Sequence, residues 1–163
     1  MTLRKKGLLI ENPLLVPVVL TTLYIPSTTV FNARHRNDLF NIQASMKTTL
    51  YINGREARQA VNLTNFAKDL TALSSSSAGI TQLCSTQSRI IKFLEKQIAL
   101  QRKEDVTQNK QVVNTLAELL EFAKQMLEAE QQHNAYIKES AQAHVQMVCL
   151  HFLYLTKIFS FLL

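Results

Sequence analysis

The most regular feature of the chain is an apolar stripe that begins at Leu63 and recurs at alternating intervals of three and four residues. Nine of its eleven positions are apolar, and the spacing is typical of the seam that supercoiled α-helices bury. The stripe crosses Ser74–Ser77 and Gly79, where we expect the helix to continue with a kink or a close helix crossing, although a serine loop is the alternative. The stripe comprises Leu63, Phe66, Leu70, Leu73, Ser77, Ile80, Cys84, Gln87, Ile91, Leu94 and Ile98.

A second stripe with the same spacing predicts a second helix from Val113 to Val148. Eight of its eleven positions are apolar, and Glu130, Asn134 and His144 form polar layers. Such layers commonly fix register and partner number at some cost in stability. The stripe comprises Val113, Leu116, Leu120, Ala123, Leu127, Glu130, Asn134, Ile137, Ala141, His144 and Val148.

The ten residues "QRKEDVTQNK" (101–110) separate the two stripes and predict an interruption. Asp105 and Gln108 have the spacing of a capping box, so we expect a new helix to begin near Val106. The seam register also shifts by four residues here. The shift indicates either a turn between two helices or a stutter within one continuous helix.

The distribution of charge favours the turn over the continuous helix. Residues 89–103 carry a net charge of +4, whereas residues 118–139 carry a net charge of −3. A chain that folds back between these segments brings opposite charges together, which favours that pairing over its alternatives. The residues expected to face one another are Arg89 and Lys92 on the first helix and Glu118 and Glu121 on the second.

These patterns predict an all-α fold whose central part, residues 55–148, is a long antiparallel helical hairpin or coiled coil. Two stripes alone form a narrow core, so a third helix or a partner must complete it. We expect a protein partner, or a second copy of the chain, to pack on the strongest apolar seam positions. These candidate partner-binding residues are Leu63, Phe66, Leu70, Leu73, Ile80, Ile91, Leu94, Ile98, Leu116, Leu120, Leu127 and Ile137.

The N-terminal segment, residues 1–54, is predicted to be an irregular arm. Its basic start and the apolar run over residues 8–31 resemble a secretory signal or a membrane segment, which would make the protein secreted or membrane-associated. Pro13 and Pro17 argue against both because they break helical continuity. The alternative is an extended, β-branched arm that packs on a partner.

The end of this arm, "TTLYINGREA" (48–57), predicts a short strand or extended piece. Asn53–Gly54 is a typical turn dipeptide, so we expect the chain to turn there before the first long helix begins.

The C-terminal tail, residues 149–163, is predicted to extend the second helix. The second stripe reaches Val148 in phase, and beyond it apolar residues cover all sides. Lys157 lies near the middle of an apolar stretch of about 25 Å, shorter than the ~30 Å hydrocarbon core of a bilayer. We expect partial membrane insertion or burial against a partner, although translation into an intron also produces such a change in composition.

The net charge of +6 is concentrated in the N-terminal segment. Residues 1–36 supply +4, whereas residues 37–147 supply only +1. A nucleic-acid surface normally gathers Lys and Arg on a folded face, so this distribution argues against nucleic acid as a partner.

The residues that carry catalytic or metal chemistry are sparse. Cys84 and Cys149 fit no metal spacing, and Glu130 with His133 forms a single Glu-x-x-His where di-metal bundles use two. Three glycines leave no phosphate-binding loop, and no serine lies in a nucleophile elbow. We therefore expect neither an enzyme nor a cofactor.

Three hypotheses of function remain. The first is a non-enzymatic structural subunit that binds partner helices through its coiled-coil seam. The second is a membrane-associated stalk or bilayer-binding module that contacts the membrane through residues 8–31 and 149–163. The third, a secreted helical component of a bacterial translocation apparatus, requires cleavage of the N-terminal segment and is based on general likeness alone.

Overall fold

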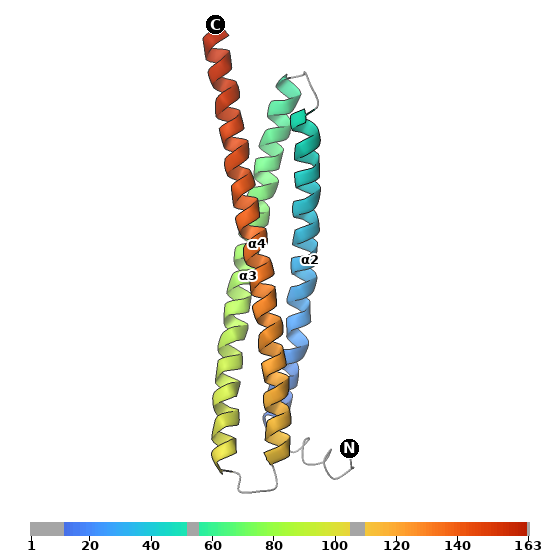
Figure 1. Ribbon diagram of the computed structural model, residues 1–163, viewed down its shortest axis with the longest axis vertical. Coiled ribbons are helices and arrows are strands. Elements are labelled where there is room, and N and C mark those ends of the chain that lie inside the picture. The colour runs from blue at the N-terminus through green and yellow to red at the C-terminus, as the bar shows by residue number, and fades with distance from the viewer. Residues whose placement is uncertain (1–11, 52–55, 105–109, 163) are drawn as a thin grey trace. The chain divides into compact units, whose positions relative to one another are not determined.

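The structure is a computed structural model that describes residues 12–51, 56–104 and 110–162. These ranges hold three helices, α2 (Leu15–Tyr51), α3 (Glu56–Glu104) and α4 (Lys110–Leu162), and no strand (Figure 1). The predicted all-α fold is therefore confirmed. The predicted capping box at Asp105 and Gln108 and the turn at Asn53–Gly54 lie outside the described residues.

Helix α2 corrects the prediction of an irregular N-terminal arm. Residues 15–51 are helical, and they include residues 48–51, for which a strand or extended piece was expected. Two prolines led to that error, but both lie where a helix accepts proline. Asn12 caps the helix, since its Oδ1 accepts a hydrogen bond from the Leu14 N–H at 2.9 Å. Pro13 directly follows this cap, at a position where the missing N–H is not needed.

Pro17 is tolerated for the same reason. Leu15 donates its N–H to the Asn12 carbonyl at 3.0 Å in a first turn, and the i→i−4 hydrogen bonds begin just after the proline, where Val18 donates its N–H to the Leu14 carbonyl at 3.1 Å. Pro26, in contrast, lies inside the helix and removes one helical hydrogen bond. Tertiary packing overrides this penalty, because the flanking Ile25 and Thr28 are fully buried.

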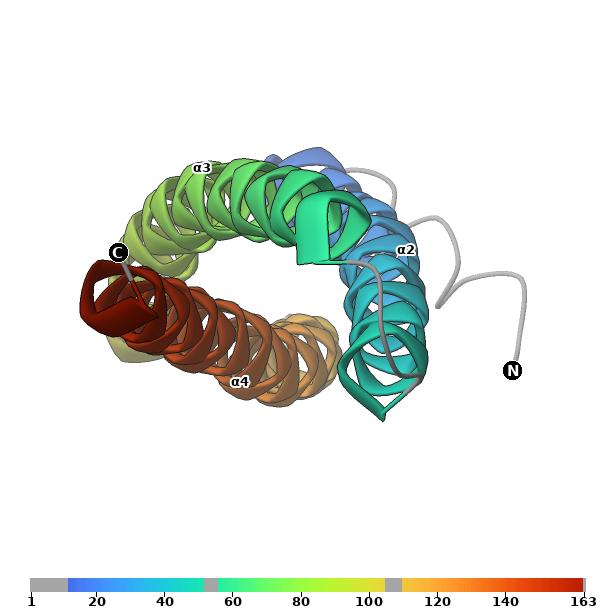
Figure 2. The ribbon, with the colours of Figure 1, turned by 90° about the horizontal axis from the view of Figure 1, so that it is seen from above.

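The helices pack as two compact units, each built from one segment of every helix. Unit 1 contains Met1–Val30 and Gln82–Gln132, and unit 2 contains Phe31–Thr81 and His133–Leu163. Within each unit α3 runs antiparallel to both α2 and α4 (Figure 1). Figure 2 shows α2, α3 and α4 from above. Helix α2 is thus the third helix that the two stripes require, although supercoiling of the seam stays a prediction.

The register of α3 against α4 in unit 1 differs from the predicted one. Lys124 Nζ donates to Glu95 Oε1 at 3.3 Å, and Gln131 Nε2 donates to Ser88 Oγ at 3.0 Å. Arg89 therefore lies near the level of residue 130, and the expected pairing of Arg89 and Lys92 with Glu118 and Glu121 is wrong. The prediction placed the turn too early, because α3 continues to Glu104 and α4 starts only at Lys110.

The core of unit 2 is a cluster of apolar side chains from all three helices. Leu39 and Met46 come from α2 and pack with residues of α3 and α4 in one cluster. The α3 and α4 members of this cluster are Leu63, Leu70, Leu73, Ile137, Ala141 and Val148, with Phe66 partly buried beside them. Gln43 Nε2 also donates to Ser140 Oγ at 3.2 Å, which joins α2 to α4.

Helix α3 passes through Ser74–Ser77 and Gly79 without interruption, so the serines form no loop. A Cβ atom added at Gly79 would meet nothing within 4 Å, and no close helix crossing occurs there. Helix α4 continues to Leu162, which agrees with the predicted extension of the second helix. Figure 1 shows this end of α4 running past the ends of α2 and α3.

Candidate functional site

The predicted partner-binding residues lie inside the chain's own bundle. In unit 1, α3 and α4 bury Ile91, Leu94, Ile98, Leu116, Leu120 and Leu127. In unit 2 the buried members are Leu63, Leu70, Leu73, Ile80 and Ile137, and only Phe66 is partly buried. Helix α2 covers the seam that the sequence left open. Whether a partner also meets these residues stays a prediction, and the surfaces available in this structure lie elsewhere.

Two polar layers interrupt the buried seam. In unit 2, Asn134 Nδ2 donates to the Ser77 carbonyl at 2.8 Å and to Thr81 Oγ1 at 2.9 Å. In unit 1, Cys84 is fully buried, and this burial, together with the nearby Glu130 carboxylate, raises the pKa of its thiol. A raised pKa keeps Cys84 protonated and unreactive near neutral pH. Both layers are structural in character.

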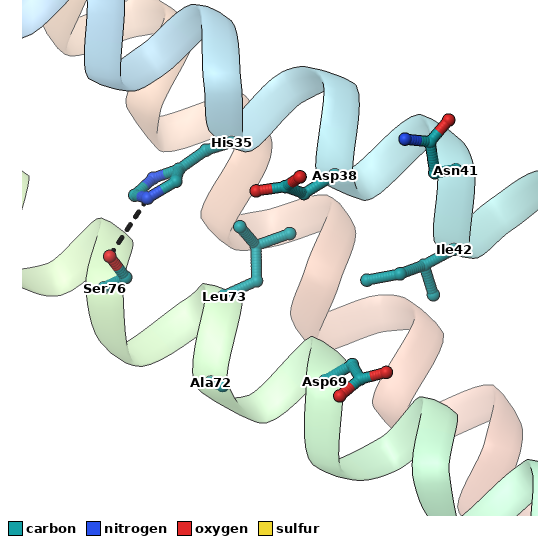
Figure 3. Close-up of a pocket in the computed structure, with 8 residues that line it drawn as sticks. All are labelled: His35, Asp38, Asn41, Ile42, Asp69, Ala72, Leu73 and Ser76. Atoms are coloured by element: carbon teal, nitrogen blue, oxygen red, sulfur yellow. Dashed lines mark hydrogen bonds between the residues drawn. The ribbon is translucent and has the colours of Figure 1, made fainter.

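An open groove of about 420 Å³ lies between α2 and α3 in unit 2. Figure 3 shows His35 and Asp38 on α2 facing Ser76 and Asp69 on α3, with a contact of 3.0 Å between His35 Nε2 and Ser76 Oγ. The set resembles the members of a catalytic triad, but two parts are missing among the described residues. No hydrogen bond joins Asp38 to His35, and the helical backbone leaves no free N–H for an oxyanion hole.

The same groove offers no metal site. Among the residues that the structure describes, no three His, Cys, Asp or Glu side chains gather closely enough to hold a metal ion. The single Glu-x-x-His of Glu130 and His133 is divided between a buried carboxylate and an exposed imidazole. The groove is therefore an open furrow between two helices, lined by both polar and apolar side chains.

An apolar surface lies on α2 and α3 of unit 1. On α3, the spacing of Ile90, Phe93 and Leu100 places them on one side of the helix. On α2, Leu20 and Tyr24 are four residues apart and are neighbours on the helix surface. All five of these unit 1 side chains are exposed, among them Leu20 at 60% and Phe93 at 59%.

The outward side of α2 in unit 1 enlarges this surface. It exposes Leu23 at 68%, together with Val16, Val19 and Val30. Asn12 Nδ2 donates a hydrogen bond of 3.2 Å to Gln101 Oε1, and this bond places the start of α2 beside the end of α3. The α2 and α3 residues therefore occupy the same part of unit 1. We call them the apolar face: Val16, Val19, Leu20, Leu23, Tyr24 and Val30 of α2, with Ile90, Phe93 and Leu100 of α3.

Three hydroxyl groups on this part of α2 donate to carbonyls of the helix itself. Thr21 Oγ1 donates to the Pro17 carbonyl at 2.8 Å, Thr22 Oγ1 to the Val18 carbonyl at 2.9 Å and Ser27 Oγ to the Tyr24 carbonyl at 2.6 Å. These side chains need no water as a partner. The hydroxyl groups of Thr21, Thr22 and Ser27 therefore do not require solvent, whereas the buried Thr28 Oγ1 has no hydrogen-bond partner among the described residues.

Length and composition single out one stretch of the described helices, Leu15–Lys47, as able to cross a membrane. Core helices of soluble proteins and signal sequences share these two properties. Only 22% of the most apolar window is buried within the chain, however, which is unlike a core helix. The sequence signal for this surface was the apolar run 8–31, but the run did not show which side of the helix remains exposed.

A row of basic residues borders the apolar face on α3. Arg89, Lys96 and Lys103 are exposed and spaced by seven residues, with Lys92 beside them. The acidic residue of this part of α3, Glu95, is directed to α4, where its contact with Lys124 raises the pKa of the Lys124 ammonium group. The row therefore carries positive charge that no described acidic residue of unit 1 neutralises.

Compared with models of protein families, with curated proteins and with solved structures, the chain shows no significant match.

Proposed function

We propose that this protein is a non-enzymatic helical module that binds a membrane surface through the apolar face of unit 1. The observation that supports the proposal is that α2 is apolar on both its inward and its outward side in this unit. Its inward side is buried at Val18 and Ile25, and its outward side exposes Leu20 and Leu23. A helix that is apolar on all sides needs protein or lipid on every side, and the chain covers only one.

The chemistry of the outward side favours lipid as the cover. Residues 12–33 contain no charged side chain, and the hydroxyl groups of Thr21, Thr22 and Ser27 bond to carbonyls of their own helix. In an apolar phase every polar group must be satisfied internally, and these groups meet that requirement. An apolar face of this size on one helix flank is typical of proteins that lie in the membrane interface.

Flotation of the full-length protein with phospholipid vesicles tests the proposal. We expect the protein to float, and the double substitution Leu20→Gln/Leu23→Gln to weaken vesicle binding at least tenfold. Burial of a leucine side chain contributes about 1.5–3 kcal/mol, and tenfold corresponds to about 1.4 kcal/mol. Both leucines are more than half exposed, so the substitution leaves the core intact.

The matched control is Phe40→Gln/Tyr136→Gln, which removes two side chains of unit 2 that are 68% and 61% exposed. Circular dichroism and urea titration establish that both double variants fold. Equal loss of binding in the control, or failure of the folded wild-type protein to float, would contradict the proposal.

A second candidate is the interaction subunit that binds partner helices. The exposed apolar end of α4 favours it, since Leu150, Leu153 and Tyr154 lie beyond Val148, the last buried residue in the described part of α4. Light scattering on the same samples separates the two candidates. A discrete soluble oligomer that Leu150→Gln/Leu153→Gln dissociates, without any flotation of the wild-type protein, would favour the interaction subunit.

A further inference from the structure

We infer that the apolar face selects bilayers rich in anionic phospholipid, and that the basic row Arg89, Lys92, Lys96 and Lys103 is the selecting element. The inference rests on the proposed membrane binding and names the headgroup chemistry that the same surface recognises. It is carried by an observation independent of the apolar face, namely the position and the lack of neutralisation of the basic side chains.

The basic row lies directly beside the apolar residues of α3. Arg89 is four residues from Phe93, and Lys96 is three residues from Phe93 and four from Leu100. Residues three or four apart are neighbours on a helix, with Cβ atoms about 5–6 Å apart. When Phe93 and Leu100 reach the acyl boundary, the long Arg and Lys side chains therefore extend to the phosphate level.

Two acidic residues of unit 1, Glu95 and Glu121, are directed to Lys124 and not to this row. On α3, Glu95 contacts Lys124 of α4 at 3.3 Å, and on α4, Glu121 lies 3.8 Å from the same Lys124. Residues 82–103 of the sequence contain five basic residues and one acidic residue, Glu95. The α3 side of the apolar face is therefore positively charged, and it is complementary to an anionic surface rather than to a neutral one.

In unit 2, the surface between α2 and α3 carries acidic side chains. There the α2–α3 furrow presents Asp38 and Asp69, both of which an anionic surface repels. The change from acidic to apolar residues confines the membrane-binding chemistry to unit 1.

Vesicle binding by full-length protein tests the inference, with neutral phosphatidylcholine vesicles and vesicles that also contain phosphatidylserine. Each Lys or Arg near an anionic surface contributes about 1 kcal/mol, so Arg89→Gln/Lys96→Gln/Lys103→Gln is expected to weaken binding to anionic vesicles by about 100-fold. Binding to neutral vesicles is expected to change less than twofold. The wild-type preference for anionic vesicles is expected to fall as salt is added, because added salt screens the charges.

The control is Arg36→Gln/Lys47→Gln/Lys68→Gln, three exposed basic residues of unit 2. It removes the same three positive charges from the chain, so a general effect of net charge would appear equally in both variants. Equal losses in the two variants, or equal wild-type binding to both kinds of vesicle at low salt, would overturn the inference and leave the proposed membrane binding in place. Absence of binding to either vesicle would instead refute the proposed function.

The wild-type salt dependence keeps the inference testable if the triple variant does not fold. Binding of the soluble protein to an acidic amphipathic peptide, without binding to vesicles, would also overturn it, since the basic row would then recognise a protein partner.

Discussion

Replacing Asn134 with leucine is expected to stabilise the fold, because the amide is buried in an apolar seam and only half satisfied. Asn134 is 2% exposed, and its Nδ2 makes both of its hydrogen bonds, to the Ser77 carbonyl and to Thr81 Oγ1. Its Oδ1 is buried and has no hydrogen-bond partner among the described residues. A buried acceptor without a partner loses its hydration and gains nothing in return.

The magnitude follows from three contributions. Removing the unsatisfied oxygen relieves about 1–3 kcal/mol, and burying a leucine side chain contributes about 2 kcal/mol. Loss of the two hydrogen bonds costs about 1 kcal/mol each, and the larger side chain adds strain of about 1 kcal/mol or more. Thr81 keeps its own hydrogen bond to the Ser77 carbonyl at 3.0 Å, so no new unsatisfied donor arises there. The net effect is a free energy of unfolding raised by about 1 kcal/mol.

Urea denaturation followed by circular dichroism measures this change, with Asn134→Ala as the control. The alanine variant loses the same hydrogen bonds and the same unsatisfied oxygen, but it leaves a cavity and gains no apolar contacts, so it is expected to be about 1 kcal/mol less stable than wild type. The order of stability is then leucine, asparagine, alanine. A leucine variant at or below the wild-type value would refute the reasoning, because it would show that Asn134 is fully satisfied in its layer.

Three further predictions concern α2 and the cysteines. Pro26→Ala is expected to raise the free energy of unfolding by up to about 3 kcal/mol, since Pro26 is exposed inside α2; an unchanged value in urea denaturation would contradict a helix there. Cys149 is exposed and Cys84 buried, so maleimide is expected to label Cys149 rapidly and Cys84 only on unfolding, as mass spectrometry of peptides can show. Because burial raises the pKa of Cys84, the unfolded thiol ionises first, and stability is expected to fall as pH rises above about 8.5; equal labelling rates would argue against burial.

The sequence predicted the interior of α3 and α4 well, because periodicity reports directly which side of a helix is buried. Every position of the two stripes is buried except Phe66 and His144, which are partly buried. The polar members behave like the apolar ones, since Ser77 and Asn134 keep the phase of the stripe and pair with each other across the seam. The pattern of positions, more than the identity of each residue, carried this information.

The same reasoning failed for α2, because both sides of that helix are apolar. The buried residues Val18 and Ile25 keep a seven-residue spacing, but exposed leucines and valines fill the positions between them. An amphipathic pattern needs a polar side for contrast, and α2 has none in unit 1. Because this periodicity was hidden, the prediction rested on the prolines. It was wrong because Pro13 and Pro17 both precede the first i→i−4 hydrogen bond, which Val18 donates to Leu14.

The apolar outward side of α2, which obscured the helical pattern in the sequence, is also the basis of the proposed function. In unit 1 and unit 2 alike, polar residues are placed inside, as Gln87, Glu130 and Asn134 show, and each reduces the stability of the seam. In unit 1, apolar residues are placed outside, where they contribute nothing to the folded chain in water. Neither the buried polar residues nor the exposed apolar residues stabilise an isolated bundle. Both are consistent with a bundle whose register is fixed internally by polar layers and whose outer surface is covered by another apolar phase.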